Sequence, residues 1–215
     1  MTPLRLGEAE RGRLTAGAAA LGIELDAAAS GRLAGFADAL DVWNAKTNLI
    51  SCGSATELVD RHILDALALD PLLPEEGPIA DLGSGAGFPG LPLAVVRPDQ
   101  SILLVESRRR KASFLREVKR LLGLGNVEVL EQRAESAPDP SERVAAVVSR
   151  AVWSDASLTV LAPHWLKTGG QLFWMRADHS HPADDHGNTE LRWERRMAYS
   201  IGTGPRRVVD IFVRA

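Results

Sequence analysis

The feature that most constrains this chain of 215 residues is a short apolar run that leads directly into a glycine-rich loop. The run Ile79–Leu82 is followed by Gly-Ser-Gly-Ala-Gly, which is typical of a buried strand that turns into a helix. Similar apolar runs recur downstream, with helical stretches between them, at residues 102–105, 127–130, 144–148, 171–175 and 208–213. Alternating strands and helices favour a mostly parallel, twisted sheet with helices on both faces, so we predict a doubly wound α/β fold.

The first third of the chain has helical periodicity instead. Its apolar residues recur at steps of three and four. On a helix this spacing places them on one face, as it does for Leu33, Phe36, Leu40 and Trp43. A second helix is expected over residues 55–69. We therefore predict a helical N-terminal extension over residues 1–72 and one compact α/β core over residues 73–215.

Composition narrows the class of protein. The single cysteine, Cys52, excludes an intramolecular disulfide, and no apolar run approaches the roughly 18 residues of a membrane span. The first residues lack the basic start and apolar stretch of a signal peptide, so we expect a cytoplasmic protein with no membrane partner. Because the formal net charge is −3, any nucleic acid must bind a local basic patch. We expect a monomer.

The glycine loop predicts a nucleoside-containing cofactor. Ligands of doubly wound sheets bind at the carboxyl ends of the strands, where Gly83 and Gly85 let the backbone turn sharply and approach a ligand. The spacing is G-x-G-x-G, not the G-x-G-x-x-G of dinucleotide-binding proteins. Asp81 precedes the loop, and its charge would repel a pyrophosphate but attract the sulfonium and ammonium groups of S-adenosylmethionine. A purely structural glycine turn is the alternative.

Two later segments extend this predicted pocket. Glu106 ends the second strand, where a carboxylate can accept hydrogen bonds from both ribose hydroxyls. Ala134 and Glu135 follow the third strand, in the loop where an adenine amino group could be recognised. We therefore predict S-adenosylmethionine as the cofactor. A nucleotide-dependent oxidoreductase is the less favoured reading of the same loop.

Several short motifs then carry a family resemblance. They occur in a fixed order: Trp43-Asn44, Asn48-Leu49, Arg61-His62-Ile63-Leu64-Asp65, residues 81–90, Arg97-Pro98-Asp99, Phe114-Leu115 and Ser149-Arg150-Ala151. Together they resemble the bacterial 16S ribosomal RNA guanine-N7 methyltransferases, the glucose-inhibited division protein B family. The resemblance implies a Rossmann-like methyltransferase fold and methylation of N7 of guanine 527 in 16S ribosomal RNA of the small subunit.

The resemblance also implies roles for individual residues. Gly83 and Phe88 would contact S-adenosylmethionine from the loop, Ala134 and Glu135 would hold its adenine side, and Arg150 would lie between cofactor and acceptor. The chain departs from the family pattern at Arg176-Ala177, where Lys-Gly is usual, and over residues 178–188, which are rich in His and Asp. We interpret those His and Asp residues as polar surface, not as a metal site.

The residue types also limit the chemistry. Methylation of a pyrimidine at C5 commonly needs a cysteine nucleophile. The single cysteine, Cys52, lies in the helical extension, so this reaction is not favoured. Ser149-Arg150-Ala151-Val152 stands where amine methyltransferases commonly carry an Asn/Asp-Pro-Pro-aromatic segment. Guanine N7 has a lone pair and no proton to lose, so we expect positioning without a general base and assign no catalytic residue. A non-catalytic RNA-binding or ribosome assembly factor remains the alternative.

The remaining polar features have two readings each. The basic run of Arg108, Arg109, Arg110 and Lys111 is interpreted as RNA-binding, with a solvated helix face as the alternative. His62 and Asp65, three residues apart on a helix, are interpreted as a buried structural pair that hydrogen-bonds directly.

Overall fold

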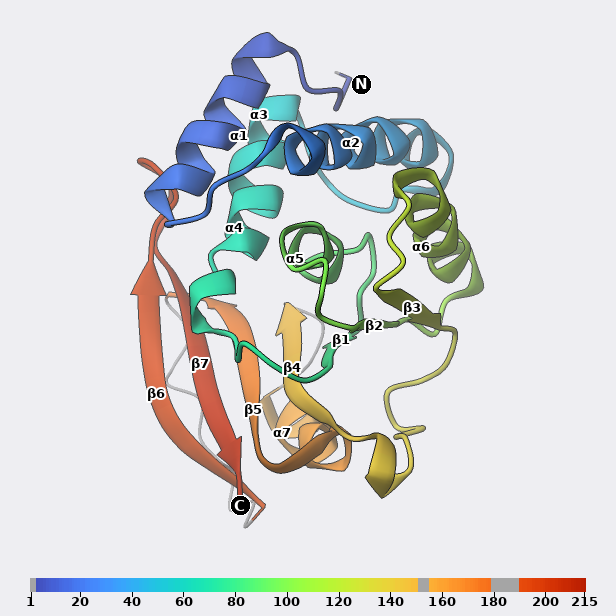
Figure 1. Ribbon diagram of the computed structural model, residues 1–215, viewed down its shortest axis with the longest axis vertical. Helices are drawn as coiled ribbons and strands as arrows, with labels where there is room; N and C mark the ends of the chain where they lie inside the picture. Colours follow the sequence, from blue (N-terminus) through green and yellow to red (C-terminus); the bar gives the residue numbers. More distant parts are fainter. Residues whose placement is uncertain (1–2, 151–154, 179–189) are drawn as a thin grey trace.

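The computed structural model describes residues 3–150, 155–178 and 190–215, and it contains one seven-stranded sheet (Figure 1). The sheet order is β3-β2-β1-β4-β5-β7-β6. The strands are β1 (Ile79–Leu82), β2 (Ile102–Val105), β3 (Val127–Leu130), β4 (Val144–Arg150), β5 (Leu166–Ala177), β6 (Leu191–Tyr199) and β7 (Arg207–Arg214). Strands β1 to β5 are parallel, whereas β7 runs antiparallel to β5 and β6. The predicted mostly parallel α/β fold is confirmed.

Helices cover both faces of this sheet. They are α1 (Glu8–Ala20), α2 (Ala27–Thr47), α3 (Ala55–Leu58), α4 (Leu64–Leu67), α5 (Gly90–Val96), α6 (Arg109–Leu122) and α7 (Asp155–Trp165). Successive strand residues point to opposite faces. Accordingly, Ile79 belongs to the apolar cluster that contains Leu91 of α5 and Phe114 of α6, whereas Ala80 packs in the cluster of Leu158 and Trp165 from α7.

The N-terminal helices pack on the same face as α5 and α6 (Figure 1). Leu14 and Phe36 are fully or almost fully buried in the cluster that also contains Leu104 of the sheet. The division of the chain at residue 72 stays a prediction. The helix expected over residues 55–69 is present, but a π-helical turn over Val59–Ile63 separates α3 from α4. Such turns shift the following side chains around the helix axis and often occur at functional sites.

Helix α6 shows how the sequence places the basic run. Ala112, Leu115 and Val118 are buried on its inner side, so the interleaved basic residues lie on the outer side. The helix begins at Arg109 and ends at Leu122, and the next residue, Gly123, caps it in a left-handed conformation (φ +62°).

Strand β6 was not predicted from the sequence. Of its nine residues only Leu191 is buried, because β6 is the outer strand and pairs with β7 alone. Trp165 at the end of α7 and Trp174 of β5 are buried. Within the described residues, no helix combines the length and apolar character needed to cross a membrane.

Candidate cofactor and acceptor site

The glycine loop leaves β1 at the carboxyl end of the parallel strands and leads into α5. Gly85 has a left-handed backbone (φ +58°), and a Cβ built there would have its nearest neighbours at 3.7 Å, the Gly83 carbonyl oxygen and Lys111 Nζ. Gly90 has a different reason to be glycine, because a Cβ there would collide with the Leu104 side chain and lie 2.8 Å from Asp81 Oδ2. The loop therefore has one glycine that keeps its outer surface open and one that permits close packing underneath.

A cavity of about 310 Å³ opens beside this loop. Five of the predicted cofactor residues line it, from three separate segments: Gly83, Gly85, Glu106, Ala134 and Glu135. Arg108, Lys111 and Gln132 line it too, although the sequence had not assigned them to the pocket. The structure thus brings the carboxyl ends of β1, β2 and β3 to one concave, polar site.

Glu106 joins the strand end to the glycine loop. Its Oε2 accepts a hydrogen bond from the Gly85 amide at 3.0 Å, and its Oε1 accepts one from the Arg108 amide at 2.7 Å. A carboxylate has about four lone-pair sites, so each oxygen can still accept a hydroxyl donor. The geometry fits the predicted ribose contact and also explains how the loop is held against β2.

Asp81 lies beneath the loop and not on the cavity surface. Its side chain is fully buried, and Oδ2 accepts a hydrogen bond from the Gly90 amide at 3.0 Å. The other oxygen, Oδ1, is buried without a hydrogen-bond partner among the described residues. Burial in this apolar setting raises the pKa of Asp81 to about 7, because the charged form loses its hydration. An unpartnered buried carboxylate oxygen favours a cation nearby.

Phe88 and Arg150 are brought together on the other side of the loop, outside the cavity. The Arg150 guanidinium lies over the Phe88 ring, 4.9 Å from its centroid. Its Nη2 is 3.2 Å from His62 Nδ1, and its Nη1 is 3.4 Å from Asp65 Oδ2. Arg150 therefore links the carboxyl end of β4 to the glycine loop and to the helical layer.

Asp65 is the centre of this second cluster. The fully buried carboxylate accepts a hydrogen bond from the Tyr199 hydroxyl at 2.8 Å and pairs with Arg207 at 3.1 Å, in addition to Arg150. The predicted direct bond to His62 is wrong: among the described residues both side chains bind Arg150 instead of each other. The sequence did not predict that His62 and Asp65 contact Arg150, or that Tyr199 and Arg207 contact Asp65.

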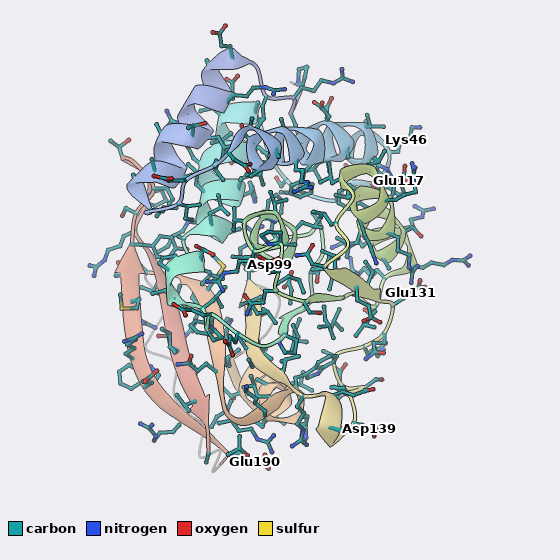
Figure 2. All side chains as sticks on the ribbon, viewed as in Figure 1. Lys46, Asp99, Glu117, Glu131, Asp139 and Glu190 are labelled. Carbon is teal, nitrogen blue, oxygen red and sulfur yellow. The ribbon has the colours of Figure 1, made fainter. Side chains whose placement is uncertain are left out.

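The basic run of four residues divides between two surroundings. Arg108 and Lys111 line the cavity, whereas Arg109 and Arg110 are exposed at the start of α6. Further along the helix Arg116 pairs with Glu131 at 2.6 Å, and Figure 2 shows Glu131 at the end of β3, on the same side of the molecule as Glu117 of α6. RNA binding by the run stays a prediction, and Arg109 and Arg110 are the two members that do not line the cavity. Residues 179–188 of the His- and Asp-rich segment, and Ala151, lie outside the described residues.

Comparison with known proteins matches most of this chain. The family model for rRNA small subunit methyltransferase G matches residues 30–203. Two similar curated proteins carry the name "Ribosomal RNA small subunit methyltransferase G". The protein from Azoarcus sp. (strain BH72) is 37% identical over 190 residues, covering 88% of each chain. The protein from Stenotrophomonas maltophilia (strain K279a) is 41% identical over 168 residues, covering 78% of this chain and 77% of the relative.

Solved structures support the fold. TYW2 of M. jannaschii, crystallised in complex with AdoMet, has a TM-score of 0.55 at 17% identity, covering 72% of this chain and 76% of that protein. NSun6 from Pyrococcus horikoshii, crystallised with SFG, also has a TM-score of 0.55, at 13% identity over 71% of this chain and 51% of that protein. At such low sequence identities, these similarities show the fold alone.

Proposed function

The chain belongs to the rRNA small subunit methyltransferase G family, and from this premise we propose that it transfers a methyl group from S-adenosylmethionine to N7 of a guanine in 16S rRNA, guanine 527. The observation that carries the proposal is the juxtaposition of two sites at the carboxyl ends of the strands. A polar cavity beside the glycine loop can hold a nucleoside, and the Arg150 cluster lies next to the same loop through Phe88.

The chain's own residues fit S-adenosylmethionine. Glu106 presents lone pairs for the ribose hydroxyls, and Ala134 and Glu135 border the cavity where the adenine would lie. Asp81 places a carboxylate with one unpartnered oxygen under the loop, where it would stabilise the positive charge of the sulfonium or ammonium group. Arg108 and Lys111 supply cations at the same cavity for the cofactor's carboxylate.

The cofactor supplies a methyl group that is already activated for transfer. The lone pair of guanine N7 forms the new N–C bond, the S–C bond breaks, and its electron pair stays on sulfur. Because N7 carries no proton, no side chain has to accept one. The chain's task is alignment of the two reactants, which can contribute up to about 7–11 kcal/mol to the rate. Arg150 is held for this task by Asp65, His62 and the Phe88 ring.

RNA would reach the site across the start of α6. Arg109 and Arg110 are exposed beside the cavity, where they can contact phosphates without occupying the cofactor pocket. The small ribosomal subunit is then the partner. We propose that the protein acts as a monomer in the cytoplasm, where such subunits are assembled.

The test is methyl transfer from labelled S-adenosylmethionine to small subunits that lack the modification, followed by mapping of the labelled nucleotide. The proposal expects label at one guanine N7. Gly83→Asp should abolish transfer, because it places a side chain at the cavity wall on a residue whose own backbone is left-handed (φ +78°). Gly22→Asp is the matched control, because Gly22 has a similar φ of +81° and open space around it near the end of α1.

Cofactor binding without transfer to any RNA would contradict the proposal and favour a binding or assembly factor. A thermal shift with NAD but none with S-adenosylmethionine would contradict it in favour of an oxidoreductase. Label at a pyrimidine or an exocyclic amine would keep the enzyme class and overturn the N7 assignment.

A further inference from the structure

We infer that His62 recognises the acceptor guanine, by donating a hydrogen bond from its Nε2–H to guanine O6. The inference rests on the proposed function, since it names the residue of that same site which distinguishes guanine from adenine. It follows from the position of the imidazole proton, from the place of the ring and from the chemistry of the purine edge.

The position of the proton follows from Arg150. Its Nη2 lies 3.2 Å from His62 Nδ1, and a guanidinium can only donate. His62 Nδ1 must therefore accept, which puts the single proton of the neutral ring on Nε2. Burial lowers the pKa of His62 to about 3, with Arg150, Arg61 and Arg207 adding to the effect, so the ring stays neutral throughout the physiological range. His62 is thus a donor of fixed direction.

The ring lies beside the glycine loop, on the side where the proposed function places the acceptor base. It packs against Phe88 of the glycine loop with ring centroids 5.4 Å apart and an interplanar angle of 44°. The π-helical turn Val59–Ile63 presents His62 at this point, between the helical layer and the carboxyl end of β4. His62 is only partly buried, and within the described chain its Nε2 has no hydrogen-bond partner.

The purine edge that carries N7 supplies the acceptor. Guanine presents N7 and O6 there, both of them acceptors, whereas adenine presents N7 beside an amino donor. An Nε2–H directed at O6 would bind guanine and oppose adenine, donor against donor. The purine also gains positive charge as N7 is methylated. A neutral imidazole does not repel that positive charge. The nearby charge of Arg150 is paired with Asp65, which reduces its repulsion of the base.

The test measures base preference. Small subunits are reconstituted from 16S rRNA that carries guanine, inosine (which keeps O6 and the N1–H but lacks the 2-amino group) or 2-aminopurine (which lacks O6 and the N1–H) at the target position. Single-site kcat/KM is compared after normalising to the reactivity of each N7 towards dimethyl sulfate. The wild-type enzyme should accept inosine nearly as well as guanine and prefer both over 2-aminopurine by about tenfold or more, as expected when a hydrogen bond is lost.

Three variants separate recognition from folding. His62→Phe keeps a ring against Phe88 but removes both the Nε2–H donor and the Nδ1 acceptor of Arg150. Transfer to both bases should therefore fall, and transfer to guanine should fall by about tenfold or more beyond the fall for 2-aminopurine. His62→Gln can place an amide N–H near the Nε2 position and should restore part of the guanine preference. His164→Phe, at an exposed histidine of α7, is the matched control and should behave as wild type.

Each outcome decides. If His62→Phe slows guanine and 2-aminopurine equally, or if the wild-type enzyme shows no preference for O6, the inference is wrong while the proposed function stands. If the wild-type enzyme transfers nothing to guanine subunits, the proposed function itself has failed. If His62→Phe loses its S-adenosylmethionine affinity through misfolding, the preferences of the wild-type enzyme and of His62→Gln give the answer.

Discussion

Two fully buried aspartates stand at the same end of the sheet, yet their surroundings are opposite. The Asp65 carboxylate receives the Tyr199 hydroxyl and lies against two arginines, Arg150 and Arg207. The Asp81 carboxylate receives one backbone amide, that of Gly90, and has an oxygen without a partner among the described residues. Asp65 thus has direct cationic partners, whereas Asp81 has no direct cationic contact among the described residues and feels the charge of Arg150 only from further away.

The difference separates two tasks within one site. A buried carboxylate that is fully paired fixes its partners, so Asp65 acts as the positioning residue that orients Arg150. Burial destabilises the charged form of Asp81 more than the Gly90 amide and the more distant charge of Arg150 stabilise it, so the pKa of Asp81 is raised to about 7. In our account Asp81 obtains its counter-charge from the cofactor, so it lowers the stability of the free protein and increases affinity.

The largest effect is expected for Asp65→Asn. Removing the charge would leave Arg150 and Arg207 without a carboxylate in a buried cluster, which should cost about 3 kcal/mol or more of unfolding free energy. Chemical denaturation measures this loss. Asp60→Asn is the control on the same π-helical turn, because Asp60 pairs with the exposed Arg13 and should matter little. Equal stability of the two variants would remove the distinction drawn for Asp65.

Asp81→Asn should have the opposite sign in the free protein. The pKa of Asp81 is raised from 3.8 to about 7 on folding, so the native state loses stability as pH rises through this interval. The neutral amide avoids that loss and should raise Tm by about 5 °C at pH 8, with a smaller gain toward pH 5. The same variant should lose most of the thermal shift produced by S-adenosylmethionine. A lower Tm at pH 8, or an unchanged cofactor shift, would contradict the assignment.

Gly85→Ala separates strain from binding. A side chain there lies in a left-handed conformation at the cavity wall, so cofactor affinity should fall by about tenfold, with about 1 kcal/mol lost in stability. Gly123→Ala has a similar φ of +62° and open space around it at the end of α6, so it should show the stability loss alone. Isothermal calorimetry and denaturation together make the comparison, which fails if both variants bind equally well.

The smallest effect is a pH dependence of cofactor affinity. A cationic ligand pairs with the ionised form of Asp81, so affinity should rise a few-fold between pH 6 and pH 8 as the group with a pKa of about 7 loses its proton. Calorimetry in buffers of different ionisation enthalpy should detect proton release on binding at pH 6. Asp81→Asn should flatten this part of the profile, and an unaltered slope in the variant would assign the dependence to another group.

The two aspartates also mark how far the sequence could be interpreted. The placement of Gly83 and Glu106 at one cavity could be predicted because it follows from local order, a loop after one strand and the end of the next strand. The burial of Asp81 beneath the loop could not, because it depends on packing against α5. The partners of Asp65 lie 85 residues away at Arg150 and 134 residues away at Tyr199, and no local pattern indicates such contacts. The helical spacing predicted a hydrogen bond between His62 and Asp65, but in the folded chain both side chains contact Arg150.

The fold, like the site, was predictable only where the sequence carries a local signal. The parallel strands β1, β2 and β4 are mostly buried and mostly apolar, so their sequence runs stand out. Strand β6 has charged and exposed residues along most of its length, and its pairing with β7 is what makes it a strand. The π-helical turn that presents His62 has no sequence signature of its own, because it depends on the packing of α3 and α4 against neighbouring helices.

The most direct test of the account is a ¹³C NMR titration of the Asp81 carboxyl in the free protein and with S-adenosylmethionine bound, with the resonance assigned through Asp81→Asn. The account predicts a pKa near 7 in the free protein and a value shifted well below it in the complex. A pKa close to that of an ordinary aspartate in the free protein, or one that the cofactor leaves unchanged, would contradict the claim that this buried carboxylate is the partner of the cofactor's cation.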